Sequence, residues 1–328
     1  MNYLIIGAGA VGTILANCLK LEKEDKIFAI RSKKSSDKIL NIEVDIIEHL
    51  KDKIKLNKNV IYQYDEEIVN IAFVTVKSNQ LENMKDILQT LNCKVSKIVC
   101  LMNGMGWEDY FKSFDTVYGI VMYNAFKIDN KVILGSKGGL IIDEAIKPKL
   151  EGRISSLPVQ YAKDIQQYRY RKLWLNTING FLSLFGFSLF QLFEESKKYD
   201  YKPLIIFKNY LEETGKLFDR LSIKSSVLPS LDPLDLISLI EKIINKKELN
   251  QKEEILFNNL PKGKNSTLQS IEKKEETEYR FIGGYLVNIA EKINFQYILN
   301  KFVTEKILNY DRTKEFKFIQ LSSIMDMI

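Results

Sequence analysis

The residue types best suited to chemistry gather in the stretch RKLWLNTING, residues 171–180. On an ideal helix Asn176 lies one turn from Lys172, and Asn179 returns to within about 20° of the same direction. A lysine and two amides then share one face among apolar neighbours. If this face is exposed to solvent, the pattern is that of any polar helix surface and indicates no function. If the face packs against a nucleotide-binding domain, it places a lysine next to a polar substrate.

Proton transfer has few other candidates in this chain. His49 is the only histidine, which excludes a His-rich zinc site and a Ser-His-Asp arrangement. It lies in a charged, helical-looking stretch and is expected to be a surface or packing residue. Any proton transfer must therefore use Lys, Tyr, a carboxylate or water, and we expect no metal site.

A second polar stretch runs from Asn265 to Gln269 and through residues 275–279 to Gly283-Gly284. The pattern predicts a helix over 276–293, with carboxylates in its first turns and two glycines in its middle. Capping residues and acids that complement the helix dipole explain much of this pattern without any function. The two glycines, which destabilise a helix, suggest a close approach by another backbone.

The element that must position a nucleotide is the N-terminal sequence NYLIIGAGAVG. The apolar run from Tyr3 to Ile6 predicts a strand, and the periodicity after Gly12 predicts a helix. Gly7 permits the tight turn, Gly9 lets a pyrophosphate approach the backbone, and Gly12 lets the helix pack closely on the strand. The context favours dinucleotide binding over a simple connecting turn.

A second strand, residues 26–30, ends at Arg31-Ser32-Lys33-Lys34. A basic residue about twenty positions after the glycines accommodates a 2′-phosphate, whereas an acidic residue there binds the ribose hydroxyls of NAD. The sequence therefore favours NADP(H), with a solvated basic turn as the alternative.

Two further apolar runs, residues 70–76 and 97–102, predict buried parallel strands that end at Lys77 and at the turn beginning with Asn103. The carboxyl ends of such strands share one edge of the sheet, so the glycine loop, Arg31, Lys77 and Asn103 are expected on the same rim. Residues 38–68 show no clear pattern and are expected to form irregular strands and short helices.

The remaining pattern divides the chain into two domains. From Thr116 onward β-type segments follow, with Asp129-Asn130 and Gly138-Gly139 as hairpin signals. Beyond Pro158 helical periodicities dominate, at 166–185, 202–220, 231–246, 276–293 and 296–309. We predict an α/β Rossmann-type N-terminal domain with a mostly parallel sheet, residues 1–163, followed by an all-α domain, residues 164–328, that binds substrate and carries out catalysis.

Composition is that of a globular protein: 328 residues, 45% hydrophobic and 27% charged, with a net charge of +6. The charge is spread along the chain, so neither nucleic acid nor membrane is expected as a partner. Cys18, Cys93 and Cys100 lie in apolar segments, which is typical of reduced thiols. The first strand leaves no room for a signal peptide, so we expect a cytoplasmic protein, either monomer or homodimer.

Taken together, GAGAVG, Arg31, TVKSNQ, MNGMG, YRKLWLN and NSTLQS…TEYRFIGGYL resemble the ketopantoate reductase family (2-dehydropantoate 2-reductase) over nearly the whole chain. The resemblance implies reduction of ketopantoate to pantoate by NADPH, on the route to pantothenate and coenzyme A. It implies that Lys172 is the general acid, assisted by Glu278.

The resemblance also implies the binding residues. The expected substrate contacts are Asn103, Asn176 and Ser266, and Asn179 is added to them because it shares the Lys172 face of the predicted helix. The expected NADP(H) contacts are Gly7, Ala8, Gly9, Ala10, Val11, Gly12, Arg31, Lys77, Asn103, Ala125 and Glu278.

One departure from the family concerns the substrate. The family usually has an asparagine followed by proline eight residues after its lysine, and this chain has Gly180 and Phe181. Either Asn179 takes the place of that asparagine, or the pocket is shaped for another 2-oxo acid or carbonyl substrate. A third possibility is a regulatory protein that binds NADPH without turnover, and the presence of both Lys172 and Glu278 argues against it.

Overall fold

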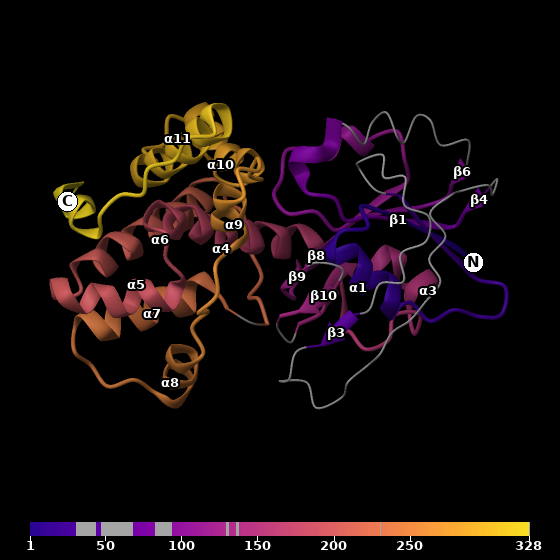
Figure 1. Cartoon of the computed structure of the whole chain (residues 1–328), viewed down its shortest axis with the longest axis horizontal. Helices are drawn as coiled ribbons and strands as arrows, with labels where there is room; N and C mark the ends of the chain where they lie inside the picture. Colours follow the sequence, from indigo (N-terminus) through magenta and orange to yellow (C-terminus); the bar gives the residue numbers. More distant parts are fainter. Residues whose placement is uncertain are drawn as a thin grey trace. The chain divides into compact units, whose positions relative to one another are not determined.

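The computed structural model describes residues 1–30, 44–46, 68–82, 94–128, 131–135, 138–229 and 231–327. The chain divides into two compact units (Figure 1). The first comprises Met1–Asn103 and Trp107–Ile165, and the second comprises Gly104–Gly106 and Gln166–Ile328. Arg31, His49, Cys93 and most of the stretch 38–68 lie outside the described residues.

The first unit is built on a seven-stranded sheet in the order β12-β11-β8-β7-β5-β1-β2. Its strands are β1 (Asn2–Ile6), β2 (Lys26–Ile30), β5 (Ile71–Val74), β7 (Ile98–Cys100), β8 (Thr116–Val121), β11 (Leu140–Asp143) and β12 (Val159–Ala162). All neighbouring pairs are parallel except β8 with β11. β5 and β7 are buried along their whole length, as expected for strands covered on both faces.

Smaller elements complete this unit. β3 (Val44–Ile46), β10 (Lys131–Leu134) and β9 (Ala125–Ile128) form a three-stranded sheet, and β4 (Ile68–Val69) pairs with β6 (Lys94–Val95). The helix α1 (Ala10–Cys18) contacts β9 and β10. Short helical segments are η1 (Ser78–Gln80), η2 (Glu108–Phe111), η3 (Glu144–Ile146) and α3 (Lys147–Leu150).

One of the two hairpin predictions is confirmed. β9 and β10 pair antiparallel across residues 129–130. The prediction at Gly138-Gly139 is wrong, because β11 pairs with β8 and β12 and not with β10. These two glycines instead allow a close approach of backbone: a Cβ on either one would overlap the carbonyl oxygen of Met122 or Pro158.

The second unit is helical. Its elements are α4 (Ile165–Phe185), α5 (Leu189–Ser196), η4 (Lys197–Tyr199), α6 (Lys202–Arg220), α7 (Pro233–Ile244), α8 (Gln251–Asn258), α9 (Ser266–Glu272), η5 (Tyr279–Phe281), α10 (Gly283–Lys292), α11 (Ile298–Thr313) and η6 (Leu321–Met327). A single apolar core joins α4, α5, α6, α7, α10 and α11, with buried aromatic rings such as Phe181, Phe207 and Tyr210 in tilted contact.

The helix predicted over 276–293 begins later than expected. Residues 276–278 are not helical, η5 follows, and α10 starts at Gly283. The two glycines therefore open the helix and do not interrupt it. The acidic residues 275, 276 and 278 precede it and do not lie in its first turn.

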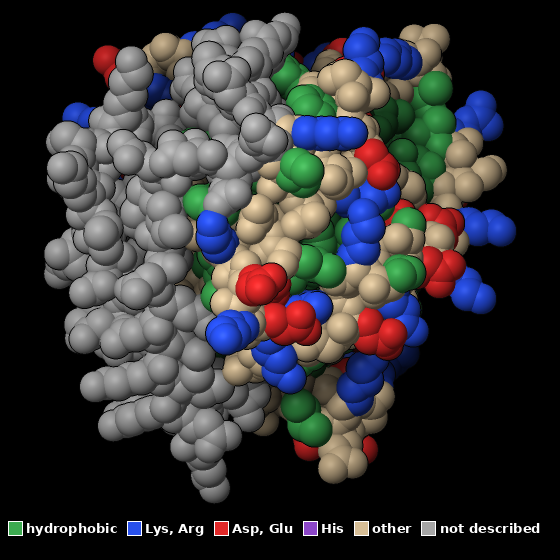
Figure 2. All heavy atoms as spheres, turned by 90° about the vertical axis from the view of Figure 1, so that its right-hand side faces the viewer, with side chains coloured by type: hydrophobic (Ala, Val, Ile, Leu, Met, Phe, Trp, Pro, Cys, Tyr) green, Lys and Arg blue, Asp and Glu red, His purple; other side chains and the backbone are tan. Residues whose placement is uncertain are grey.

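Two further features bear on the protein class. Cys18 and Cys100 are buried, and neither forms a disulfide bond within the described part of the chain. Among the described residues no single helix suffices to cross a membrane, although α4 together with Leu189–Tyr199, bent by 58°, meets the length and composition criteria as a pair. On the described part of the face in Figure 2, basic and acidic side chains are interspersed.

Candidate active site

The glycine loop of the first unit is open where a phosphate would approach. Gly9 is exposed, and a Cβ added to it would have only the carbonyl oxygen of Gly7 within reach, at 4.0 Å. Gly9 also begins α1 without a side-chain cap, and the first turn carries no acidic residue. Since the first N–H groups of a helix have no partner inside it, this loop fits a dinucleotide pyrophosphate.

The other two glycines of the motif face protein. Gly7 adopts φ +99°, and a Cβ there would lie 2.7 Å from the backbone nitrogen of Val76. A Cβ on Gly12 would overlap the carbonyl oxygen of Gly7 and would lie 2.8 Å from Ile5. Both glycines are thus required by packing between β1, α1 and the end of β5.

Thr75 is a supporting residue that sequence reasoning missed. Its hydroxyl donates to the carbonyl oxygen of Gly7 at 2.8 Å, and its backbone nitrogen donates to Ile6 at 2.9 Å. The hydroxyl directly after the apolar run 71–74 was the available signal. Thr75 fixes the turn from the neighbouring strand.

The predicted rim is confirmed for the residues that the structure describes. β1, β5 and β7 are parallel, so the glycine loop, Lys77 and Asn103 follow the same ends of adjacent strands. Lys77 and Asn103 are both half-buried, and the carbonyl oxygen of Asn103 accepts from the indole of Trp107 at 3.2 Å. The end of β2 joins them, because Gly7 donates to Ile30 at 2.9 Å.

For two predicted cofactor contacts, Arg31 and Ala125, the structure gives no contact that bears on the predicted role. Arg31 follows Ile30 but lies outside the described residues. Ala125 is half-buried and begins β9 in the smaller sheet. Their roles remain predictions.

In the second unit α4 carries Lys172, Asn176 and Asn179. Asn176 is buried, whereas Lys172 and Asn179 are half-buried. Burial lowers the pKa of Lys172 to about 8. Lys172 therefore remains mostly protonated at neutral pH while lying close to the range in which it can lose a proton.

Tyr279, the residue after Glu278, is hydrogen-bonded to the same helix. The Tyr279 hydroxyl donates to the carbonyl oxygen of Thr177, directly after Asn176, at 3.2 Å. This bond ties the segment that carries the half-buried Glu278 to α4, although the two segments are a hundred residues apart.

A second anchor holds the other side of Glu278. Asp311 of α11 accepts from the backbone nitrogen of Thr277 at 2.8 Å and from its hydroxyl at 2.6 Å. Burial raises the pKa of Asp311, and the bonds from Thr277 oppose that rise. Thr277, Tyr279 and Asp311 were not found from the sequence, because their contacts are non-local.

Ser266 is exposed at the start of α9. Its neighbour Asn265 caps α9 by accepting from Leu268 at 3.0 Å. Asn265 also accepts from the Ser183 hydroxyl of α4 at 3.2 Å, while Ser183 donates to the carbonyl oxygen of Asn179 at 2.6 Å. These bonds hold α4, which carries Asn179, next to the start of α9, which carries Ser266.

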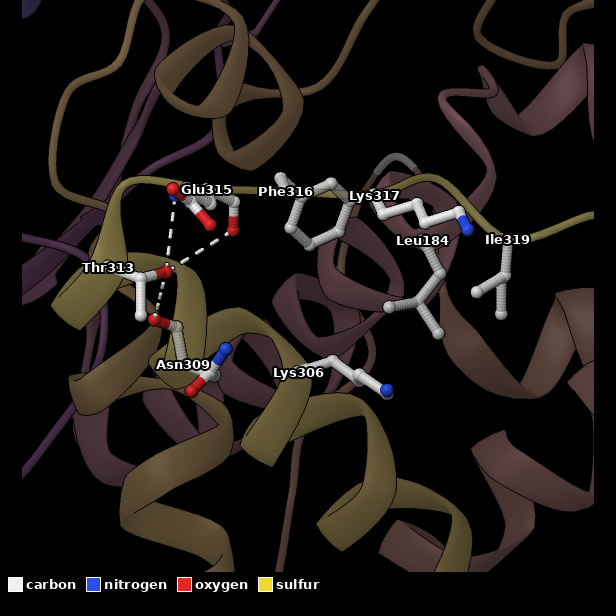
Figure 3. A pocket seen from close by; sticks show the side chains of 8 residues that line it. All are labelled: Leu184, Lys306, Asn309, Thr313, Glu315, Phe316, Lys317 and Ile319. Atoms are coloured by element: carbon white, nitrogen blue, oxygen red, sulfur yellow. Dashed lines mark hydrogen bonds between the residues drawn. The ribbon is translucent and has the colours of Figure 1, made fainter.

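A separate depression of about 350 Å³ lies along the end of α11 (Figure 3). It is lined by Leu184, Lys306, Asn309, Thr313, Glu315, Phe316, Lys317 and Ile319. None of the predicted site residues lines it, so we do not assign it to the active site. Among the described residues no group of three or more His, Cys, Asp or Glu side chains is placed to hold a metal ion.

Two family models match the chain. The model described as "Ketopantoate reductase PanE/ApbA" matches residues 3–145, and its C-terminal counterpart matches residues 164–311. The chain belongs to the ketopantoate reductase family. Its fold, a mostly parallel sheet domain followed by a helical domain, is that of this family, and membership makes it a ketopantoate reductase-like oxidoreductase.

Solved structures agree on the fold. A dimeric ketopantoate reductase from Staphylococcus aureus has a TM-score of 0.72 at 16% identity, over 96% of this chain and 100% of that one. A PanE/ApbA family ketopantoate reductase from Ralstonia eutropha has a TM-score of 0.71 at 14% identity, over 96% and 99%. D-mandelate dehydrogenase with NADH and anilino(oxo)acetate has a TM-score of 0.67 at 19% identity, over 96% and 99%. No curated protein sequence matches significantly.

Proposed function

We propose that the protein reduces ketopantoate to pantoate with NADPH, a step toward pantothenate and coenzyme A, and that Lys172 is its general acid. The observation that carries the proposal is a half-buried lysine with its pKa lowered to about 8, on the helix to which Tyr279, the neighbour of Glu278, is hydrogen-bonded. Family membership supports the reaction class.

The residues of the chain have separate tasks in this reaction. When bound, the nicotinamide supplies a hydride to the 2-oxo carbon. Negative charge then develops on the carbonyl oxygen, where the Lys172 ammonium stabilises it and donates a proton. Asn176 and Ser266 bind the substrate without adding a titratable group, and Glu278 orients the ammonium or the substrate.

The preference for NADPH is also a proposal, and Arg31 is the residue that we expect to meet the 2′-phosphate. Arg31→Ala should weaken NADPH binding much more than NADH binding, by about tenfold or more for the loss of one charge-assisted contact. Dissociation constants for both nucleotides, measured by fluorescence titration, check this. Equal losses for the two nucleotides would show that Arg31 does not read the 2′-phosphate.

The function itself is tested by following NADPH absorbance with ketopantoate and a panel of other 2-oxo acids. We expect the highest kcat/KM for ketopantoate. A wide preference for another acid would overturn the substrate and leave the reaction type intact.

A second candidate, reduction of a different 2-oxo acid by the same mechanism, is favoured by one observation. At Gly180, eight residues after Lys172, the chain presents no side chain to a substrate, and Tyr279 occupies the adjacent space. The D-mandelate dehydrogenase among the similar structures indicates that the fold also serves other acids.

A further inference from the structure

The depression at the end of α11 is formed mainly by the segment that follows this helix (Figure 3). Five of its eight lining residues lie beyond residue 311, where the match to the family model ends: Thr313, Glu315, Phe316, Lys317 and Ile319. Leu184, which lines it from α4, lies twelve residues after Lys172, about 18 Å along the helix axis. The depression is therefore separate from the candidate active site and lies largely outside the family match.

Contacts within the helical unit hold the walls of the depression in place. The backbone nitrogen of Ile319 donates to the carbonyl oxygen of Leu184 at 2.9 Å. The ring of Phe316 packs edge-on against Tyr310, with 5.9 Å between the centroids. Leu321, just beyond, is buried in the helical core. The depression is thus formed by the protein itself, as small-molecule sites usually are.

The lining combines apolar side chains with two ammonium groups. Leu184 is buried, and Phe316 and Ile319 are half-buried. Lys306 and Lys317 are exposed, and in Figure 3 their ammonium ends lie on the same side of the depression as Leu184 and Ile319. An apolar surface and positive charge are therefore presented together.

The acidic group of the lining lies elsewhere. In Figure 3 Glu315 is on the opposite side of the depression, next to Thr313. The Thr313 hydroxyl donates to the carbonyl oxygens of Asn309 at 3.0 Å and Glu315 at 3.4 Å, and it accepts from the backbone nitrogen of Glu315 at 3.2 Å. This side of the lining is therefore engaged with itself.

The positive charge of the two lysines is not neutralised by the protein. Within the described part of the chain neither Lys306 nor Lys317 forms an ion pair, whereas Lys301 on the same helix pairs with Glu291 at 2.7 Å. The Lys306 ammonium lies 5.6 Å from the centroid of the Phe302 ring, a contact that leaves its charge uncompensated. Both ammonium groups can therefore serve a negatively charged ligand.

We propose that this depression binds a small organic anion. Its apolar body packs on Leu184, Phe316 and Ile319, and its charged group is bound by Lys306 and Lys317. Small-molecule sites have volumes of about 300–1,000 Å³, so a depression of about 350 Å³ takes a small ligand. Lysines act as point charges, and they suit a carboxylate or a phosphate group alike. The inference does not rest on the proposed function.

The test uses phenyl phosphate and phenylacetate as probes. NMR titration of methyl-labelled protein should show saturable shifts at the methyl groups of Leu184 and Ile319, with a dissociation constant on the order of 1 mM for probes of this size. Following these two residues distinguishes the depression from binding at the active site. The stronger of the two probes shows whether the site favours a phosphate or a carboxylate.

Two further compounds separate the contributions of charge and apolar contact. Benzyl alcohol lacks the charge, and inorganic phosphate lacks the apolar body. Each should bind about tenfold more weakly than the better probe, or less. Added salt should weaken binding of the charged probes, because the lysines are exposed.

The lysines are tested by substitution. Lys306→Met and Lys317→Met should each weaken probe binding about threefold, and the double variant about tenfold. Lys301→Met is the matched control, because Lys301 is exposed on α11 but does not line the depression. Its dissociation constant should equal that of the wild type. Thermal unfolding checks that each variant is folded, and the single variants decide if the double variant is not.

Four results would overturn the inference. Neither probe shifts the two methyl resonances at concentrations up to about 10 mM. Benzyl alcohol binds as tightly as the charged probes. Inorganic phosphate binds as tightly as phenyl phosphate. Lys301→Met weakens binding as much as the substitutions at Lys306 and Lys317.

Discussion

The predicted site residues of the two units are positioned in different ways. In the first unit the nucleotide loop is formed by backbone within a few residues, and it works because side chains are missing at Gly9 and Gly12. In the second unit the polar groups come from α4, α9 and the segment before η5, and they work because specific side chains are present and anchored. Function should therefore be sensitive to added side-chain atoms in the first unit and to removed side-chain atoms in the second.

The strongest way to break this comparison is Lys172→Met. Loss of the ammonium removes the proton donor and the positive charge near the developing oxyanion, so kcat should fall by about 10²–10⁴-fold. NADPH affinity should be unchanged, because the glycine loop is untouched. Stopped-flow turnover and a fluorescence titration measure the two effects.

The exposed Lys216→Met on α6 is the matched control and should leave kcat unchanged. The pH profile sharpens the assignment. Since burial lowers the pKa of Lys172 to about 8, kcat for reduction should be highest below that value and fall as pH rises through it. A flat profile up to pH 10, or a Lys172→Met variant with wild-type kcat, would exclude Lys172 as the acid.

The same contrast explains how much the sequence alone could predict. β1, β2, β5 and β7 follow from apolar runs, and the glycine loop follows from local spacing, so the predicted site residues of the first unit could be found from the sequence. The helices α4, α6, α7 and α11 follow from periodicity. The short helices α5, α8 and α9 did not, because few turns give a weak pattern and their capping residues also suit loops.

The predicted site residues of the second unit depend on contacts that a sequence does not display. From the sequence, Gly180 only indicates that a side chain found in the family is missing. The structure shows that Tyr279, almost a hundred residues away, occupies the space that a side chain at 180 would need. The pair Gly283-Gly284 was misread as a helix interior for the same reason: Gly283 accommodates Tyr279. The role of a glycine could be interpreted where it depends on residues nearby in the sequence. It could not be interpreted where it depends on a tertiary contact.

Within the first unit, Gly9→Ala and Gly12→Ala should affect different properties, nucleotide affinity and fold stability respectively. Ala at position 12 overlaps the carbonyl oxygen of Gly7, so it should destabilise the fold by about 1–3 kcal/mol. Ala at position 9 meets no heavy atom closer than 4.0 Å and should change stability by less than about 1 kcal/mol. It occupies the space where a pyrophosphate approaches, however, and should weaken NADPH by about tenfold, equivalent to a 1.4 kcal/mol loss.

Thermal unfolding and nucleotide titration of both variants provide the measurement. A Gly9→Ala variant with wild-type NADPH affinity would show that the open side of the loop does not face the nucleotide. A Gly12→Ala variant of wild-type stability would show that α1 can move away from the turn at Gly7 without a loss in the free energy of unfolding.

The smallest expected effect on turnover comes from the anchor beside Glu278. Thr277→Val keeps the shape of a side chain that is almost fully buried but removes the hydroxyl that donates to Asp311 at 2.6 Å and accepts from the backbone nitrogen of Tyr279 at 3.2 Å. Leaving those groups unpaired should destabilise the protein by about 1–3 kcal/mol. It should lower kcat/KM only a few-fold, because Glu278 itself is retained.

Thr313→Val, near the end of α11, is the matched control. Its exposed hydroxyl donates to the carbonyl oxygen of Asn309 at 3.0 Å, and its removal should cost about 0.5 kcal/mol or less. The two variants separate an anchoring role from a general loss of hydroxyl groups. Because the bonds from Thr277 oppose the rise that burial causes in the pKa of Asp311, Thr277→Val should raise that pKa further, which carboxyl titration by NMR detects. An unchanged Asp311 pKa together with unchanged kcat/KM would mean that Glu278 is positioned by Tyr279 and α4 alone.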